Sequence, residues 1–359
     1  MKNFQPNREL IAEKLLQGRK PTVAVVGDYC LDQYLYIDAD LDEPSVETGL
    51  TAFQVRRKAL FPGVGGTIAN NLAALGANVR CFGLCGDDGQ GFELIRELKK
   101  IGADTDGMVQ SPDLLTGTYT KPMRQVNGVW TELNRLDIRN DHPAPAALVE
   151  KVSEKIAVAV ETCDAVIVSD QFTREAGSVL NADLRTFLSR LAEKNPSVFF
   201  LVDSRSYCER YRGAVVKCNA SEILDAVKRC DLDEKIASVT VDHDADVKEA
   251  EILAAGRRLS KRNAQPVLIT RGRRGAILID GENALRIPAF EVPPPIDICG
   301  AGDATDAALA FGRALGLDLA NAAFLAAAVS SITIQQLGVT GTADVPRILE
   351  RLGTLEPAR

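Results

Sequence analysis

The sequence predicts a three-layer α/β/α fold, in which helices cover both faces of a mainly parallel β-sheet and a small second sheet forms a lid. Short, uninterrupted apolar runs recur along the chain, as is typical of parallel strands that are buried on both faces. Amphipathic helical patterns lie between these runs, and strands that alternate with helices indicate a parallel sheet. Two stretches interrupt the alternation and indicate a separate small sheet.

The apolar pattern places the expected elements along the chain. We expect strands at Thr22–Val26, Val79–Leu84, Ala165–Ser169, Val198–Asp203, Ala214–Cys218 and Val267–Thr270. We expect helices at Glu9–Gln17, Ile68–Leu75, Gly91–Ile101, Ala146–Val160, Ala182–Glu193, Ala245–Arg262 and Ala304–Leu315. Because ligands of such sheets bind at the carboxyl ends of the strands, side chains that follow a strand directly are the first candidates for a site.

The two interrupting stretches, at about residues 33–60 and 115–137, carry the predicted lid. The first mixes aromatic, acidic and β-branched residues without a helical period. The second has Asn127-Gly128 at its centre, and Asn-Gly suits a two-residue type I′ hairpin turn because both positions require positive φ. A single domain over residues 1–359, with a core of about 20–350, accommodates both stretches. An exposed small sheet usually seeks a partner, so we expect a homodimer formed through the lid.

Composition argues against several classes of protein. The 359 residues carry a formal net charge of −7 without any Lys/Arg-dense stretch, which argues against binding to nucleic-acid backbones. The N-terminus is polar and lacks the apolar core of a signal peptide. The most apolar stretch, 319–334, is too short to span a bilayer. We therefore expect a cytoplasmic protein without a membrane partner.

The strongest chemical signal is Asp297-Ile-Cys-Gly-Ala-Gly-Asp303, followed by an Ala-rich helical segment. Glycines that open a helix leave backbone N–H groups unpaired and allow an anion to approach closely, and the helix dipole adds positive charge there. An aspartate at this position would repel a phosphate, but it suits a base that accepts the proton of a hydroxyl attacking that phosphate. The alternative is that Asp303 only caps the helix, a common role for aspartate.

This signature resembles that of the ribokinase-like (PfkB) carbohydrate kinases, and other features follow in the order seen in that family. They are a first strand end at Gly27–Asp32, a Gly-rich loop with its helix at Pro62–Gly76, Asn219-Ala-Ser-Glu222 and a turn at Thr270–Gly275. The likeness covers about residues 20–350, so it implies the ribokinase-like fold for nearly the whole chain.

The resemblance also implies site residues and cofactors. It implies ATP and Mg²⁺ as cofactors, Asp303 as the general base, and Gly300, Ala301 and Gly302 as the anion hole. The residues implied at the nucleotide are Asn219, Glu222, Thr270, Gly272 and Gly275, with Glu222 holding Mg²⁺ through water. The sugar would contact Asp32, Asp28, Gly63, Gly65, Gly66 and Thr67. Many relatives hold K⁺ beside the anion hole, at a place that Asp297 matches here.

Within the family, the chain is most similar to the kinase half of the bifunctional heptose-phosphate kinase/adenylyltransferase. The stretches that carry this likeness are Val26–Tyr34, Asn134–Asp137, Ser169-Asp170 and Glu209–Ala214. No His-x-Gly-His motif of an adenylyltransferase is present, so we expect a stand-alone kinase. Arg124 and Arg135 lie on the expected lid hairpin and are candidates to bind a second phosphate, since Arg binds phosphate bidentately. Solvated strand charges are the other interpretation of these two residues.

Departures from the family pattern gather in the sugar half of the site. Thr67 stands where the family has an Asn, Val64 where it has a glycine, and Thr173-Arg174 where the heptose kinases have Lys-Gly. Thr cannot reproduce the two-ended hydrogen bonding of an amide. We therefore expect a kinase of a sugar or sugar phosphate, with a heptose 7-phosphate as one candidate. A kinase of a non-sugar alcohol such as a nucleoside, and a catalytically silent ATP-binding or regulatory relative, stay open.

Overall fold

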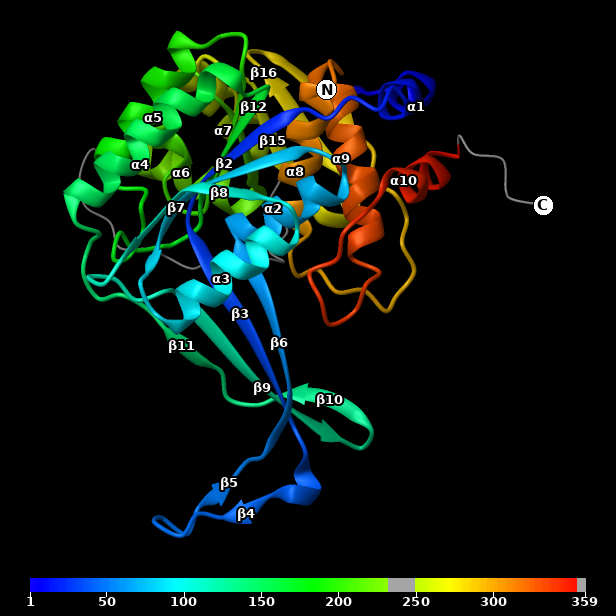
Figure 1. The fold of residues 1–359 in the computed structure, drawn as a ribbon. Helices are drawn as coiled ribbons and strands as arrows, with labels where there is room; N and C mark the ends of the chain where they lie inside the picture. The colour runs from blue at the N-terminus through cyan, green and yellow to red at the C-terminus, as the bar shows by residue number, and fades with distance from the viewer. Residues whose placement is uncertain (232–248, 354–359) are drawn as a thin grey trace.

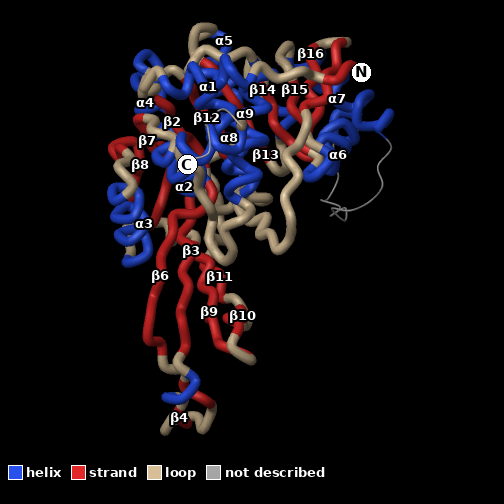
Figure 2. The backbone as a smooth tube through the Cα atoms, turned by 90° about the vertical axis from the view of Figure 1, so that its right-hand side faces the viewer, coloured by secondary structure: helices blue, strands red, loops and turns tan. Residues whose placement is uncertain are grey.

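The structure of the protein is a computed structural model that describes residues 1–231 and 249–353. The start of the helix expected at 245–262 lies outside the described residues. Figure 1 shows a layered body from which a narrow β-sheet projects, and Figure 2 shows the same projection from the side.

The core of the body is a ten-stranded sheet in the order β1-β17-β16-β15-β14-β13-β12-β2-β7-β8. Its strands are β1 (Lys2–Asn3), β2 (Thr22–Gly27), β7 (Asn78–Gly86), β8 (Asp104–Ser111), β12 (Ala165–Asp170), β13 (Phe199–Ser204), β14 (Val215–Asn219), β15 (Val267–Thr270), β16 (Ala276–Asp280) and β17 (Asn283–Ile287). The seven strands from β15 to β8 pair in parallel, and β16 is antiparallel to both of its neighbours. All parallel carboxyl ends therefore meet at one edge of the sheet.

Two layers of helices cover this sheet. One apolar cluster joins the sheet to α1 (Arg8–Leu16), α2 (Gly65–Ala74), α3 (Gly89–Lys100), α8 (Ala301–Ala314), α9 (Leu319–Thr333) and α10 (Val345–Leu352). A second cluster joins the other face to α4 (Ala146–Ala159), α5 (Ala182–Lys194), α6 (Ala220–Asp231) and α7 (Glu249–Asn263). Central strands such as β12 are buried at every position, which explains their continuous apolar runs. The predicted three-layer α/β/α fold is confirmed.

The lid is a five-stranded sheet made of β10 (Val129–Glu132), β9 (Thr118–Val126), β3 (Tyr29–Ile37) and β6 (Val55–Val64), with β11 (Leu136–Ile138) also paired to β9. Asn127 and Gly128 link β9 to β10 with φ of 51° and 81°, as a type I′ turn requires. A two-stranded ribbon, β4 (Glu43–Pro44) with β5 (Thr51–Ala52), lies at the far end (Figure 1). The lid is thus continuous with the body, because β3 begins just after β2 ends.

In the part of the chain that the structure describes, no helix is long and apolar enough to cross a membrane. Helix α9, the most apolar segment, is buried within the body instead: it packs beside α8 and α10 in the first cluster.

Candidate active site

The first turn of α8 lies at the carboxyl edge of the central sheet. Gly300 is the N-cap of this helix and has a left-handed backbone, with φ of 74°, which glycine adopts without strain. The Ala301 N–H donates to the Ile298 carbonyl at 3.1 Å, whereas the Gly300 and Gly302 N–H groups have no hydrogen-bond acceptor within residues 1–231 and 249–353. Two free amides at the positive end of a helix form a place where an anion is stabilised.

Asp303 projects from this same turn and is half-buried. Burial, together with the negative charges of Asp203 and Asp32, raises the pKa of Asp303 to about 7 against the opposing effects of Lys217 and Arg205. The carboxyl group is therefore poised to change its proton occupancy near neutral pH, as a general base must. The helix-capping alternative does not hold in its usual form, because the residue lies inside the helix rather than at the N-cap.

A buried lysine lies directly beneath this turn. Lys217 Nζ is 2.6 Å from Asp203 Oδ2 and 3.2 Å from Asp306 Oδ2. Carboxylate oxygens of Asp203, Asp303 and Asp306 all lie within 4.8 Å of one another. The ammonium of Lys217 contacts two of these three carboxylates, so this cluster has a cation of its own.

Asn219 and Glu222 form a capping box at the start of α6. Asn219 Oδ1 accepts the N–H groups of Ser221 and Glu222, each at 2.9 Å, and Glu222 Oε2 accepts the Asn219 N–H at 2.8 Å. Burial, followed by the charge of Asp203, raises the pKa of Glu222. The motif predicted for the nucleotide side thus has a structural role. Within residues 1–231 and 249–353, its bonds do not use the Asn219 amide nitrogen or the second Glu222 oxygen.

The turn from Thr270 to Gly275 joins β15 to β16 next to this capping box. Asn219 and Thr270 are register partners in neighbouring parallel strands, so the two predicted nucleotide-binding segments lie side by side. Gly272 and Gly275 have φ of 54° and 77°, and a side chain at Gly275 would overlap the Ile287 carbonyl. Both glycines are required by the tight turn itself.

Asp28 is buried at the end of β2 and is fully engaged there. Its carboxylate accepts the N–H groups of Gln171 at 3.1 Å and Phe172 at 2.8 Å, and the hydroxyl of Ser178 at 2.7 Å. Burial and the charge of Asp170 raise the pKa of Asp28 to about 7, although these three hydrogen bonds oppose the shift. These bonds favour a structural role over the expected sugar contact, because Asp28 ties the start of the lid to the loop after β12.

Asp32 lies on the lid, where its Oδ1 is 3.0 Å from Lys121 Nζ. Lys121 also donates to the Tyr34 hydroxyl at 3.0 Å, and only 12% of its side chain is exposed. Burial opposes the charge of Lys121, but Asp32 and Tyr34 together hold its pKa above the usual range. Since Asp32 also acts on the pKa of Asp303, the lid face and the first turn of α8 belong to one electrostatic neighbourhood.

The Gly-rich loop passes between Asp32 and Gly300. A methyl group on Gly63 would lie 2.7 Å from Asp32 Oδ2, and one on Gly300 would lie 3.3 Å from the Thr67 methyl. Thr67 is buried and donates to the Pro62 carbonyl at 3.4 Å. The two other glycines of the loop, Gly65 and Gly66, are buried at the start of α2. The loop therefore brings the sugar-side and phosphate-side segments into contact.

The two arginines proposed for a second phosphate already have carboxylate partners. Arg124 pairs with Asp42 at 2.6 Å, near the far end of the lid. Strand alternation places Arg124 on the face of β9 opposite to Lys121. Arg135 makes two bonds to Asp137, at 2.6 and 2.9 Å, on a strand edge next to β9. Arg135 is thus the nearer of the two to Asp32 along the sheet.

Asp297 anchors the loop that leads into α8. Its Oδ1 accepts the Cys299 N–H and its Oδ2 accepts the Gly338 N–H, each at 3.0 Å. Its own N–H donates to the Ile334 carbonyl at 2.8 Å. These bonds join the segment before α8 to the segment after α9, so the shape of the anion hole depends on both.

Sequence reasoning missed three cations of the site: Lys121, Arg205 and Lys217. Lys217 was hidden among Val215, Val216 and Cys218 of β14, and Arg205 in the loop after β13. A signal was available for both, because they lie at the carboxyl ends of parallel strands, where Asn219 and Thr270 were sought. Lys121 required knowledge of the lid pairing, which places it beside Tyr34.

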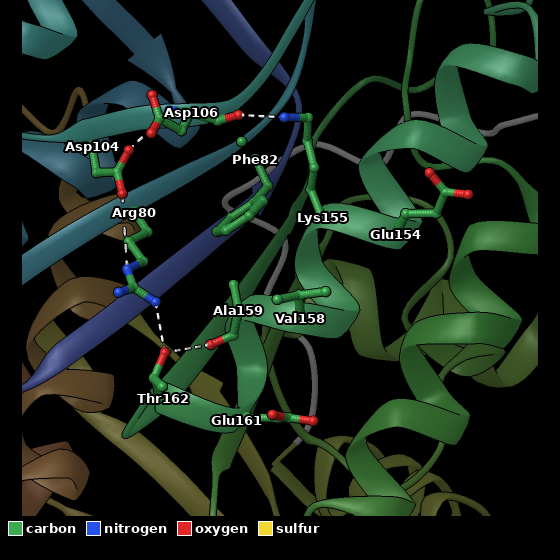
Figure 3. A pocket seen from close by; sticks show the side chains of 11 residues that line it. Arg80, Phe82, Asp104, Asp106, Glu154, Lys155, Val158, Ala159, Glu161 and Thr162 are labelled. Carbon is green, nitrogen blue, oxygen red and sulfur yellow. Dashed lines mark hydrogen bonds and ion pairs between the residues drawn. The ribbon is translucent and has the colours of Figure 1, made fainter.

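A cavity of about 670 Å³ lies elsewhere, between β7, β8 and the end of α4. Figure 3 shows Arg80 and Lys155 at its rim, with Phe82 and Val158 among the apolar groups between them. It contains none of the residues of the α8 site. Its mixed charges, with Arg80 bonded to Thr162 and Lys155 to the Asp106 carbonyl, indicate no particular ligand.

Comparisons with known proteins show the family of the chain. Residues 20–346 match the protein family described as "pfkB family carbohydrate kinase". The D-beta-D-heptose 7-phosphate kinase of Bordetella bronchiseptica is 31% identical over 92% of this chain and 95% of that protein. The bifunctional protein HldE of Trichlorobacter lovleyi is 31% identical over 93% of this chain, but this chain spans only 63% of that protein.

Solved structures agree on the fold. Ribokinase of Arabidopsis thaliana, complexed with ribose and ATP, superposes with a TM-score of 0.64 over 93% of this chain and 99% of that chain, at 17% identity. Identity this low supports the ribokinase-like fold alone. The match over residues 20–346 shows that this chain belongs to the pfkB family of carbohydrate kinases.

Proposed function

We propose that this protein transfers the γ-phosphoryl group of ATP to a hydroxyl of a sugar or sugar phosphate. The observation that carries the proposal is the first turn of α8, where a half-buried carboxyl group with a pKa raised to about 7 lies beside two free amides. Asp303 would accept the proton of the attacking hydroxyl, and the Gly300 and Gly302 amides would stabilise charge on the transferred group, with Ala301 completing the turn.

The nucleotide would lie along the carboxyl ends of β14 and β15, against Asn219 and the turn from Thr270 to Gly275, with Gly272 allowing close approach. Mg²⁺ would neutralise the phosphates when bound. Glu222 fits a role in holding its water shell, because one carboxylate oxygen is left over from the capping box. A K⁺ ion beside Asp297 belongs to the same proposal, because that carboxylate shapes the loop before α8.

The acceptor would lie between the lid and the Gly-rich loop. Asp32 is the proposed partner of sugar hydroxyls, beside Gly63, Gly65, Gly66 and Thr67, with Asp28 supporting the strand from behind. A heptose 7-phosphate or a similar sugar phosphate is the leading acceptor class, because the kinase of Bordetella bronchiseptica that carries this name is similar over nearly its whole length. Lys121 contacts Asp32, and Arg135 lies by the strand next to β9; either would suit a second phosphate.

We further propose that two copies pair through their lids. Large apolar side chains are exposed along this sheet and its tip, at Leu41, Val46, Leu50, Phe53, Val55, Val129, Trp130 and Leu136. Such a concentration on a thin projecting sheet is typical of a surface that is covered by a partner. A cytoplasmic location, where ATP and sugar phosphates are both present, accompanies this proposal.

The test is ATP consumption against a panel of sugars, sugar phosphates and nucleosides, with Mg²⁺ and with or without K⁺. We expect turnover on one acceptor, and we expect Asp303→Asn to reduce kcat by ~10²–10⁴-fold, because loss of a general base typically costs that much. Asp280→Asn, an exposed aspartate at the end of β16, is the matched control. ATP binding without turnover on any acceptor would instead favour a catalytically silent regulatory protein. Turnover on a nucleoside would show that the acceptor is a non-sugar alcohol instead of a sugar.

A further inference from the structure

We propose that Lys217 is a positioning residue for Asp303: clamped by Asp203 and Asp306, it keeps the Asp303 carboxylate ionised and holds the first turn of α8 against the sheet. The proposal rests on the kinase function above, since it assigns a task to Asp303. It is independent of which acceptor is used.

Strand pairing fixes Lys217 where it can act. Asp203 and Lys217 are register partners in the neighbouring parallel strands β13 and β14, so their side chains leave the sheet on the same face. That face is the one covered by α8, because Leu201 and Val215, two positions earlier in each strand, belong to the apolar cluster of α8. Asp306 lies three residues after Asp303 on the same side of the helix and closes the clamp from above.

The ammonium lies directly below the anion hole. A methyl group added to Gly302 would be 3.4 Å from Lys217 Nζ. A cation is disfavoured near the positive end of a helix, and burial also disfavours it. Both costs are offset by Asp203 and Asp306, which together hold the pKa of Lys217 above its usual range. The lysine is thus charged at every pH at which the enzyme would work.

The pKa values of Asp306 and Asp203 are shifted in opposite directions. Burial, reinforced by Asp203, raises the pKa of Asp306 well above its usual range. Burial also opposes ionisation of Asp203, but Lys217 and a hydrogen bond from Asp306 bring its pKa below the usual range. Of the two carboxyl groups that hold Lys217, Asp203 is therefore the one more readily ionised.

The other groups that act on Asp303 come from the elements around it. Asp203 on β13 and Asp32 on β3 oppose its ionisation, whereas Lys217 on β14 and Arg205 after β13 favour it. Asp306 follows on α8, and the thiols of Cys30 and Cys299 face the same carboxylate from β3 and from the loop before α8. Arg205 is exposed, so Lys217 is the buried cation in this set.

The experiment compares Lys217→Met with wild type over pH 5.5 to 9 in two ways. One is kcat/KM on the accepted substrate, which reports the proton occupancy of the free enzyme. The other is the NMR titration of ¹³C-labelled aspartate carboxyls in the full chain, with the Asp303→Asn spectrum to assign the signal. We expect the Asp303 titration and the acid limb of kcat/KM to move up together by about one pH unit or more, because a close opposite charge shifts a pKa by that much.

Three further variants keep the outcome decisive. Lys217→Gln, which can still donate to Asp203, serves if the Met variant folds poorly, and it should show the same upward shift. Lys217→Arg keeps the charge and should restore the acid limb, while Lys261→Met on the exposed face of α7 is the matched control. An Asp303 signal that titrates as in wild type, or a loss of kcat/KM that is equal at every pH, would overturn the proposal. Because the NMR titration needs no acceptor, it separates failure of this inference from failure of the kinase function.

Discussion

A residue next to this site can serve the fold rather than the chemistry, and Asp28 is an example. It follows β2, where sequence reasoning sought a substrate ligand, yet its three hydrogen bonds all go to the loop 171–178. Burial leaves these donors without water, so removal of the acceptor would leave them unpaired. Each such group costs about 1–3 kcal/mol.

We therefore predict that Asp28→Ala lowers the free energy of unfolding by ~3 kcal/mol or more, measured by urea denaturation. Asp28→Asn is nearly isosteric and should cost ~1 kcal/mol or less, because its oxygen can accept the two N–H groups and its amide can donate to Ser178. In wild type the folded pKa is raised to about 7, so this carboxyl contributes stability that is full at low pH and is lost as pH rises through 7.

The Asn variant should lack that component of the pH dependence. If Asp28→Asn abolished acceptor binding while stability and its pH profile stayed as in wild type, Asp28 would be a substrate ligand instead.

Among the elements, α6 begins with a motif to which we assign two roles, capping the helix and holding Mg²⁺. The capping box explains Asn219 and Glu222 without any ligand, while the proposal also gives Glu222 a role towards Mg²⁺. The two roles make different demands: the box needs a side-chain acceptor at Glu222, which Gln also provides, whereas the Mg²⁺ role needs its charge.

Glu222→Gln should therefore preserve the capping box of α6 but weaken Mg²⁺ binding. We predict a change of less than ~0.5 kcal/mol in the free energy of unfolding, against a loss of ~1 kcal/mol for Glu222→Ala. Both variants should need more Mg²⁺ for half-maximal turnover, measured by Mg²⁺ titration at saturating ATP. Equal Mg²⁺ requirements in wild type and Glu222→Gln would remove Glu222 from the metal site.

Elements also mark the limit of what the sequence could predict. Strands such as β12 and β15 were placed within a residue or so, because burial on both faces imposes a continuous apolar run. Strands β8, β16 and β17, towards the two ends of the sheet, were missed, and in β8 and β17 exposed positions interrupt that run. In the lid, the Asn127-Gly128 turn was predictable from local chemistry.

Parallel pairing of β3 with β9 was not predictable, because it joins segments almost ninety residues apart. The site divides in the same way. Motifs confined to one turn, such as Gly300–Asp303, were identifiable from their residues alone. The partners Asp32 with Lys121, and Asp203 with Lys217, come from different strands and needed the fold.

At the scale of the whole molecule, the exposed apolar residues of the lid lead us to predict a dimer. We expect a dimer in solution that becomes monomeric when Leu50 and Val129, two exposed apolar residues of the lid, are both changed to Glu. Sedimentation velocity at several concentrations measures this. Leu16→Glu on α1, an equally exposed apolar position outside the lid, is the matched control and should leave the dimer intact. A wild-type monomer at all concentrations would contradict the prediction.

The way in which β3 leaves the body has a mechanical consequence. Asp28 fastens the base of the strand, so the lid is a lever whose fulcrum lies at the carboxyl end of β2. At about 3.3 Å per residue, Asp32 lies about 13 Å from that fulcrum and the end of the strand about 30 Å. A tilt of about 10° would thus move the far end by about 5 Å but Asp32 by only about 2 Å. A partner that holds the far end of the lid therefore restricts the Asp32 carboxylate to a smaller range of positions than the far end itself.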